Sequence, residues 1–230
     1  MGRIWQYNIC LGLLLFFPNI AFSGAWIPRE GKTELIASIN TVGNDQNHNT
    51  SFEYYIARGL RTDSAFIFSQ NLKMYKDFPA ISKTDFKLQF KLLQGNGLIL
   101  SSQFGISTID SVQINYRENN MIYNMLLGYG FGKNWLNLEY GDEGCLGEYQ
   151  KTSEITFGRH VYKKDLLILK QFRAGCDYYN DNNNFQISYI KRFNNNLGIE
   201  FGLRQSIARA RFDNSENINQ GFIVSLWKRY

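Results

Sequence analysis

The sequence predicts an all-β fold, a transmembrane antiparallel up-and-down β-barrel of about 12 strands, with about 10 to 14 as the range. Three observations predict it. Apolar and polar residues alternate with a period of two along most of the chain. The alternating segments are about nine to twelve residues long, as a tilted strand needs to be to cross a bilayer, whereas strands of soluble proteins average about five or six. The mean hydropathy of −0.32 is too low for a helical membrane protein but suits a barrel with a polar interior.

Composition and charge exclude several other classes. The 230 residues are 44% hydrophobic and 20% charged, with 20 Gly, 3 Pro and 3 Cys, so a disordered, collagen-like or disulfide-dense chain does not fit. At this length we expect one domain, because large barrels run to this size undivided. The formal net charge is +5. No block of about five or six basic residues marks a nucleic-acid-binding arm, so no nucleic-acid partner is predicted.

The N-terminus predicts export. Arg3 precedes an apolar run over 9–17, followed by Pro18 and the small-residue frame that ends at Ser23. These are the three parts of a secretory signal peptide. The run is about half the length of a membrane-spanning helix, so we expect cleavage after Ser23 rather than a retained anchor. Residues 1–23 are then the signal peptide and residues 24–230 the barrel.

Each strand is predicted from its own alternation. The clearest case is 85–92, where a strand places Phe86, Leu88, Phe90 and Leu92 on one face and polar residues on the other, whereas a helix would scatter them. The expected strands, in chain order, are 35–39, 51–60, 65–75, 85–92, 98–107, 121–131, 135–140, 152–160, 165–175, 185–192, 197–204 and 221–230.

The connections are predicted to alternate between tight turns and longer loops, as in barrels with short turns on one side of the membrane. The tight turns are expected at 61–64, 94–97, 132–134, 162–165 and 194–196. The longer loops, rich in Asn, Asp, Gly or Ser, are expected at 43–50, 76–82, 141–150, 177–184 and 209–219. Segment 109–120 also alternates, but bacterial barrels have an even strand number, so we expect an external loop or an extension of a neighbouring strand there.

The last segment carries a family resemblance. Phe222, Val224, Leu226 and Tyr230 share one face, and the sequence ends at that aromatic residue, although Lys228 interrupts the apolar series. In this the chain resembles Gram-negative outer-membrane β-barrel proteins of porin-like type, over residues 24–230 and in pattern only. The resemblance implies a place in the outer membrane, contact with its lipid, and a C-terminal signal read by the barrel-assembly machinery.

The polar face of the strands is predicted to line the lumen. Its charges are nearly balanced, which permits pairing across the bore. We therefore expect a narrow or plugged channel without steep charge selectivity, weakly preferring anions. The expected lumenal acids are Glu34, Glu53, Asp85, Glu139, Glu154 and Glu200, and the bases are Lys73, Lys87, Lys91, Arg173, Arg192, Arg204 and Arg229.

Catalytic and metal-binding constellations are weak. His48 lies near Asp45 in an expected loop, and His160 precedes an expected turn on the lumenal face. A solvated turn and a polar network explain these two positions better than a general base does. Asp177 and Asp181 stand among asparagines but without the spacing of a calcium loop. No enzyme activity, metal or cofactor is predicted.

Two cysteines remain after signal cleavage, Cys145 and Cys176. In an oxidising compartment an even count predicts one disulfide, here between two loops of the same external rim. Closing a loop of about 30 residues would stabilise the fold by roughly 3–4 kcal/mol.

Three functions follow from these patterns. The first is an outer-membrane pore or channel for small polar solutes with a mixed-charge lumen. The second is a non-conducting surface or envelope barrel whose external loops bind a partner. The third is a secreted, soluble β-sandwich, in which the same aromatic residues would form a core.

Overall fold

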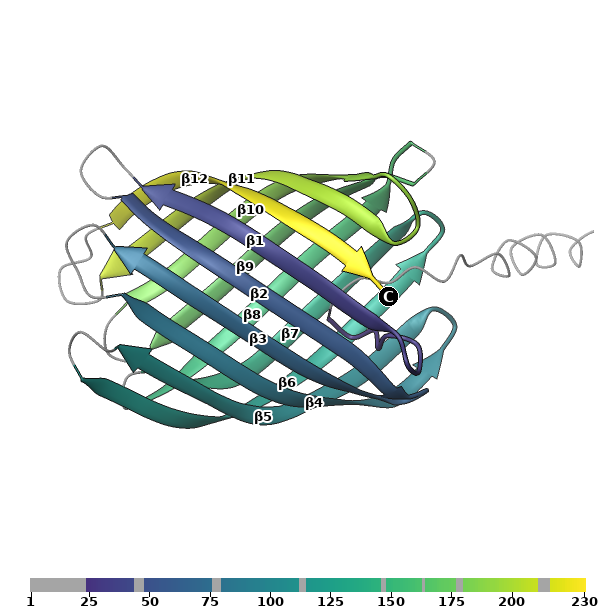
Figure 1. The fold of residues 1–230 in the computed structure, drawn as a ribbon, viewed down its shortest axis with the longest axis horizontal. Coiled ribbons are helices and arrows are strands. Elements are labelled where there is room, and N and C mark those ends of the chain that lie inside the picture. Colours follow the sequence, from purple (N-terminus) through teal and green to yellow (C-terminus); the bar gives the residue numbers. More distant parts are fainter. Residues whose placement is uncertain are drawn as a thin grey trace, which may run out of the picture.

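The described part of the chain forms a closed barrel of twelve antiparallel strands (Figure 1). The computed structural model describes residues 24–43, 48–75, 80–111, 115–145, 148–162, 164–176, 180–210 and 216–230. The predicted strand number and up-and-down order are confirmed, because each strand pairs with its neighbours in sequence. The predicted signal peptide, residues 1–23, lies outside the described residues.

The strands are longer than the alternation alone indicates, the longest having 16 residues. Their bounds are β1 Thr33–Gly43, β2 His48–Arg61, β3 Ser64–Tyr75, β4 Ile81–Gly95, β5 Leu98–Ser111, β6 Tyr116–Phe131, β7 Asn134–Cys145, β8 Glu148–His160, β9 Leu166–Cys176, β10 Asn180–Arg192, β11 Leu197–Ala210 and β12 Glu216–Arg229.

The barrel closes where the first strand meets the last. β1 and β12 pair antiparallel, with Glu34 opposite Arg229 and Ser38 opposite Ser225. Arg229 forms a 2.7 Å ion pair with Glu34, and the Ser38 hydroxyl donates to Ser225 at 3.0 Å. Because the sheet has no free edge, the third function, a soluble sandwich of two open sheets, is wrong.

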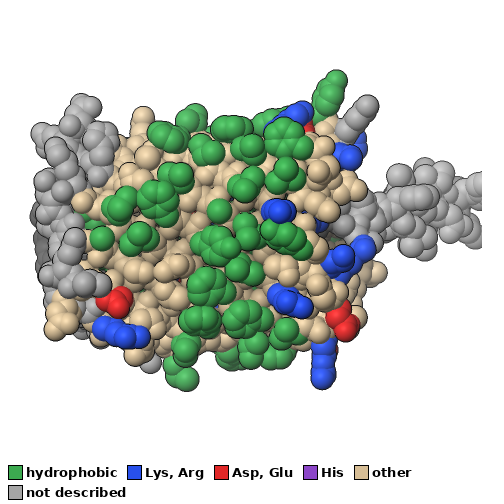
Figure 2. All heavy atoms as spheres, viewed as in Figure 1, with side chains coloured by type: hydrophobic (Ala, Val, Ile, Leu, Met, Phe, Trp, Pro, Cys, Tyr) green, Lys and Arg blue, Asp and Glu red, His purple; other side chains and the backbone are tan. Residues whose placement is uncertain are grey.

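The outer face is apolar. Large side chains such as Phe86, Phe104 and Leu203 are 43%, 50% and 68% exposed, and Figure 2 shows apolar side chains spread over the middle of the barrel. Charged side chains gather toward its two ends in the same view. A band of this kind is unfavourable in water and matches the lipid-facing band of a transmembrane barrel. In the described chain, no helix is long and apolar enough to be a membrane span.

Short turns connect the strands at one end of the barrel, called here the turn end, and the opposite end is the loop end. The β4–β5 turn has Asn96 and Gly97 at φ 48° and 81°. Both angles lie in the left-handed region, which a two-residue hairpin requires and which Asn-Gly adopts readily. Both chain ends described, residues 24–32 and Tyr230, also lie at the turn end (Figure 1). In outer-membrane barrels this end faces the periplasm.

The expected long loops are shorter in the structure. Within segment 109–120, residues 109–111 end β5 and residues 116–120 begin β6, so the expected extension of neighbouring strands is confirmed for these residues. β10 begins at Asn180 and β12 at Glu216, inside segments expected to be loops. Asn-rich composition predicts a turn, but backbone pairing with neighbouring strands keeps such residues extended. Asn182, for example, pairs with Ala174 on β9 and Ala208 on β11.

Candidate functional site: the barrel lumen

Alternate residues of every strand face the lumen, opposite the exposed apolar set. On β4, Asp85 and Gln89 are 6% and 1% exposed, whereas Phe86, Leu88 and Phe90 between and beside them are each more than 40% exposed. Such side chains cannot all reach water, so they must satisfy one another. The lumen wall is therefore a network of polar groups.

Two parts of this network show how the polar groups are paired. Asp85 accepts hydrogen bonds from Ser107 at 2.6 Å and Ser69 at 3.1 Å, and its carboxylate lies 3.9 Å from the Lys87 ammonium. These contacts join β3, β4 and β5. Hydrogen bonds of this kind offset the cost of burying a polar group.

A ladder of amides continues around the wall. Gln103 on β5 donates to Gln89 on β4 at 3.1 Å, and Asn124 on β6 lies 3.2 Å from the Gln103 oxygen. Asn124 also lies 3.0 Å from the Glu139 carboxylate on β7. The ladder fixes four neighbouring strands to one another through side chains as well as through the backbone.

Six charged residues from six strands form a group around the middle of the lumen and toward the loop end. Lys73 interacts electrostatically with Glu53, Lys83 and Arg204, and Lys170 interacts with Glu154, Glu53 and Arg204. Glu154 and Lys170 form an ion pair, in which the carboxylate oxygen lies 2.6 Å from the ammonium nitrogen. Because four of the six charges are positive, the group is cationic. We call it the central charge cluster: Glu53, Lys73, Lys83, Glu154, Lys170 and Arg204.

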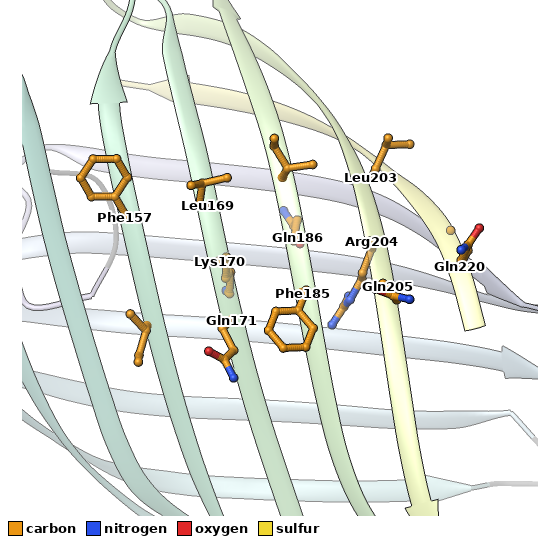
Figure 3. A pocket seen from close by; sticks show the side chains of 13 residues that line it. Phe157, Leu169, Lys170, Gln171, Phe185, Gln186, Leu203, Arg204, Gln205 and Gln220 are labelled. Atoms are coloured by element: carbon orange, nitrogen blue, oxygen red, sulfur yellow. The ribbon is translucent and has the colours of Figure 1, made fainter. Parts of the chain in front are cut away.

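A hollow of about 660 Å³ lies at β8–β12. Its lining comes from both faces of the wall, and only the inward-facing Lys170, Gln186, Arg204 and Gly221 border the lumen. Figure 3 shows Lys170, Gln186 and Arg204 on three neighbouring strands. Gln186 donates to Glu200 at 3.1 Å, so this side of the lumen offers amide and cationic donors together.

All eight lumenal charges singled out for the channel face inward in the structure. They are Asp85, Lys87, Lys91, Glu139, Glu154, Arg192, Glu200 and Arg204. Their surroundings differ. The Lys91 ammonium lies at the turn end, where it donates hydrogen bonds to the Thr62 carbonyl at 2.9 Å and to the Gln94 side chain at 2.8 Å.

One predicted lumenal base is on the wrong face. Arg173 was expected to line the bore, but it is exposed on the outer side of β9, and Lys170 faces the lumen instead. The error has a physical cause. β9 begins Leu166-Leu167-Ile168-Leu169, which is apolar on both faces, so its alternation does not define an inner side. Lys83 on β4, which was not among the predicted bases either, also faces the lumen.

At the turn end the lumen is apolar, whereas the alternation in the sequence predicts a polar lumen throughout. Trp135, Leu166, Ile168 and Ile190 form a buried cluster on inward positions of β7, β9 and β10, with Trp26 and Trp227 packed against it. Ala25, Ile99 and Leu126 form a second cluster around the same Trp26. Ala25 and Trp26 therefore lie inside the barrel, whereas residues 29–32 are exposed. The three consecutive apolar residues Ala25, Trp26 and Ile27 are the sequence signal that could have indicated it.

Asp165 holds the β8–β9 turn against β10. It accepts hydrogen bonds from the Tyr189 hydroxyl, from the Arg192 backbone at 3.0 Å and from the Lys191 ammonium at 3.0 Å. These donors, the Tyr189 hydroxyl first, lower the pKa of Asp165 to about 2, although burial opposes the shift. The turn is thus tied to β10 by a carboxylate that stays ionised in mildly acidic solution.

The other candidate groups do not assemble into a site. Asp45 lies outside the described residues, and His48 begins β2 rather than a loop. His160 is half-buried on the lumenal face of β8, and its Nε2 has no hydrogen-bond partner among the described residues. Asp177 lies outside the described residues, and Asp181 belongs to β10. No group of three or more His, Cys, Asp or Glu in the described chain is placed to hold a metal ion.

The two cysteines end β7 and β9 at the loop end, with β8 between them. Cys145 is opposite Glu148 and Cys176 is opposite Gln150. Two strand spacings amount to about 9–10 Å. A disulfide needs Cα atoms roughly 4.4–6.8 Å apart, so the bond requires these strand ends to close over β8 and stays a prediction.

Comparison with known proteins gives the fold a context. No family model and no curated protein matches the chain. Solved structures do. The NanC porin has a TM-score of 0.60 at 7% identity, covering 84% of this chain and 98% of that chain. The chain has the fold of outer-membrane porins.

Two further structures share this fold. The COG4313 outer membrane channel from Pseudomonas putida F1 has a TM-score of 0.58 at 12% identity, covering 92% of this chain and all of that chain. The KdgM porin, solved in complex with disordered oligogalacturonate, has a TM-score of 0.55 at 11% identity, covering 85% of this chain and 98% of that chain. At such identities the likeness concerns the fold, and function has to come from the lumen itself.

Proposed function

We propose that the protein is an outer-membrane channel for small polar solutes that prefers anions. The observation that carries the proposal is the central charge cluster inside a closed barrel with an apolar exterior. Its four bases stand on β3, β4, β9 and β11, so positive charge faces the lumen from two sides. Charges along a narrow, low-dielectric wall focus the field into the lumen and concentrate ions of opposite sign.

The paired arrangement within the cluster suits passage rather than tight binding. Lys170 is held by Glu154 at 2.6 Å, yet its side chain remains 36% exposed. An anionic group of a solute can therefore meet the ammonium while Glu154 limits the affinity. Conduction requires binding that is favourable enough for entry and weak enough for exit. The KdgM porin, which was solved with an anion, supports the same preference by analogy of fold only.

Single-channel recording in planar bilayers tests the proposal. We expect the purified protein to conduct, and its reversal potential in a KCl gradient to show preference for chloride. Lys170→Gln removes one of the four cluster bases and should shift the reversal potential toward the cation-selective side, with little loss of folding.

Arg173→Gln is the matched control, because Arg173 lies three residues away on the same strand but on the outer face. It should leave selectivity unchanged. A reversal potential that moves equally in both variants, or in Arg173→Gln alone, would contradict the role given to the central charge cluster.

A second candidate, a non-conducting barrel, is favoured by the apolar packing at the turn end. Such a barrel would act through its external loops or as an envelope element. It would show no conductance in bilayers under any voltage or salt, although folded as judged by heat-modifiable gel mobility.

A further inference from the structure

Residues 24–32 run across the bore at the turn end. They precede β1, whose first residue is Thr33, and their tip reaches Asn137 on β7. In the ring of twelve strands β7 is six positions from β1 in either direction, so these two strands lie on opposite sides of the barrel. In Figure 1 the purple start of the described chain lies at this end of the barrel.

Hydrogen bonds from three strands hold the tip of the segment. The Ala25 amide donates to the Asn137 side chain at 2.9 Å, the Ser101 hydroxyl donates to the Ala25 carbonyl at 2.6 Å, and the Gln89 amide donates to the Gly24 carbonyl at 2.9 Å. Asn137, Ser101 and Gln89 are all at most 1% exposed. Three buried polar side chains therefore bind one short segment. Without the segment, the Asn137 oxygen, the Ser101 hydroxyl and the Gln89 nitrogen would each lose this hydrogen bond, so the site is specific for the segment.

The other end of the segment is bound to β2. The Gly31 amide donates to the Gly59 carbonyl at 2.9 Å, and the Gly59 amide donates to the Lys32 carbonyl at 3.0 Å. The Pro28 and Arg29 carbonyls pass so close to Gly59 that an added Cβ would lie 2.3–2.4 Å from them. The segment is thus fixed both where it leaves the wall and where it meets the opposite wall.

Between these anchors the cross-section is filled with apolar groups. Trp26 contacts both buried clusters, and its ring meets Trp135 edge to face at a centroid distance of 5.9 Å. On the β2–β3 side, the inward Ala57, Ala65 and Ile67 are at most 2% exposed. A water-filled bore would leave these side chains open, whereas hydrophobic constrictions exclude water and with it polar solutes.

We propose that residues 24–32 form a barrier across the turn end of the lumen, and that Trp26 determines which solutes cross it. The inference rests on the proposed channel function and adds the place where passage is limited. Cleavage after Ser23, as the sequence predicts, would make Gly24 the first residue of this barrier.

Gly128 offers a direct test, because the three atoms nearest to its inward side belong to this segment. A Cβ at Gly128 would lie 2.8–2.9 Å from the Trp26 ring and 3.0 Å from the Ala25 side chain. Gly128→Ala should therefore displace the segment without disturbing packing inside the wall. Gly130→Ala is the matched control on the same face of β6, where the nearest atom to the new Cβ is 3.9 Å away.

The experiment measures single-channel conductance of the full-length protein in KCl, with folding checked by heat-modifiable mobility. We expect Trp26→Ala and Gly128→Ala to raise conductance at least about twofold relative to the unaltered chain, since both open the apolar layer. Gly130→Ala should match the unaltered chain. Swelling of liposomes in uncharged sugars of increasing size should show a higher size limit for the first two variants only.

The outcomes separate the two proposals. Should the unaltered chain conduct and the folded Trp26→Ala and Gly128→Ala variants conduct no better, the barrier is wrong and the channel stands. Silence of the unaltered chain together with clear conductance of the two variants supports a barrier that is closed at rest. Silence of every folded variant overturns the channel and the barrier together.

Discussion

The two ends of the lumen are built from the same strands but are opposite in character. At the turn end the inward residues of β7, β9 and β10 are Trp135, Leu166, Ile168 and Ile190, buried around a segment that crosses the bore. Further along β9 and on β11, the inward residues are Lys170 and Arg204, which stay partly exposed. The difference shows that facing inward does not decide polarity. Inward residues are apolar where they pack against another part of the chain, and polar where they face the open lumen.

Removing a large side chain from the turn end should have the largest effect on stability. Trp135 is 2% exposed, and truncating such a side chain in a packed cluster costs about 3–5 kcal/mol. We expect Trp135→Ala to lower the free energy of unfolding by about that amount, measured by denaturant titration in lipid vesicles. Phe172→Ala, at an inward and less buried position of β9, should cost clearly less. Equal losses would mean that the two ends are packed alike.

A charge on the outer face should have the next largest effect and tests whether both ends share one lipid-facing wall. Phe86 lies at mid-strand, opposite Phe68 and Ile106, and its ring packs against the Phe68 ring at a centroid distance of 5.2 Å. Phe86→Arg should destabilise the barrel by about 2–4 kcal/mol. Phe90→Arg should cost less, because Phe90 is opposite Ser64, the first residue of β3, near the turn end. Stability unaffected by either change would place this face in water.

A smaller effect is expected at Asp165, the anchor of the β8–β9 turn. Asp165→Asn weakens hydrogen bonds to an ionised group and should lower the free energy of unfolding by roughly 1–3 kcal/mol at neutral pH. The folded pKa of Asp165 is lowered to about 2 from an ordinary value near 4. The stabilisation is therefore complete above about pH 4 and is lost as the pH falls toward 2.

The measurement for Asp165 is the difference in unfolding free energy between the two proteins as a function of pH. That difference should shrink on acidification and be flat above neutrality. Asp63→Asn, at an exposed turn position of the same end, should show almost no difference at any pH. A difference that grows on acidification would show that the Asp165 carboxylate does not carry the effect.

Much of the barrel could be predicted from local pattern. Strict alternation, as in 85–92, defines a strand and its two faces without knowledge of its neighbours, and the Asn96-Gly97 turn follows from backbone conformation alone. The strand ends were harder to predict. Asn180 to Asn184 has the composition of a loop, yet it extends β10 because β9 and β11 offer backbone partners there.

The candidate site was only partly predictable. Lumenal charges such as Glu154 and Arg204 could be assigned because their strands alternate cleanly. Lys170 was missed because the strand around it is apolar on both faces. The electrostatic grouping of Lys73 with Arg204 also lies beyond any local pattern, since these residues come from β3 and β11 and face each other's charge only in the closed barrel.

By itself the sequence determined a barrel of about twelve strands and which residues of its regular strands face inward, because period two is a property of consecutive residues. Only the tertiary structure decided what fills the lumen. Ala25 binds a side chain 112 residues away, and Gly128 matters because a distant tryptophan occupies the space where its Cβ would be. Contacts of this kind form only when the barrel closes and residues far apart in the sequence come together. The alternation along a single strand therefore cannot predict them.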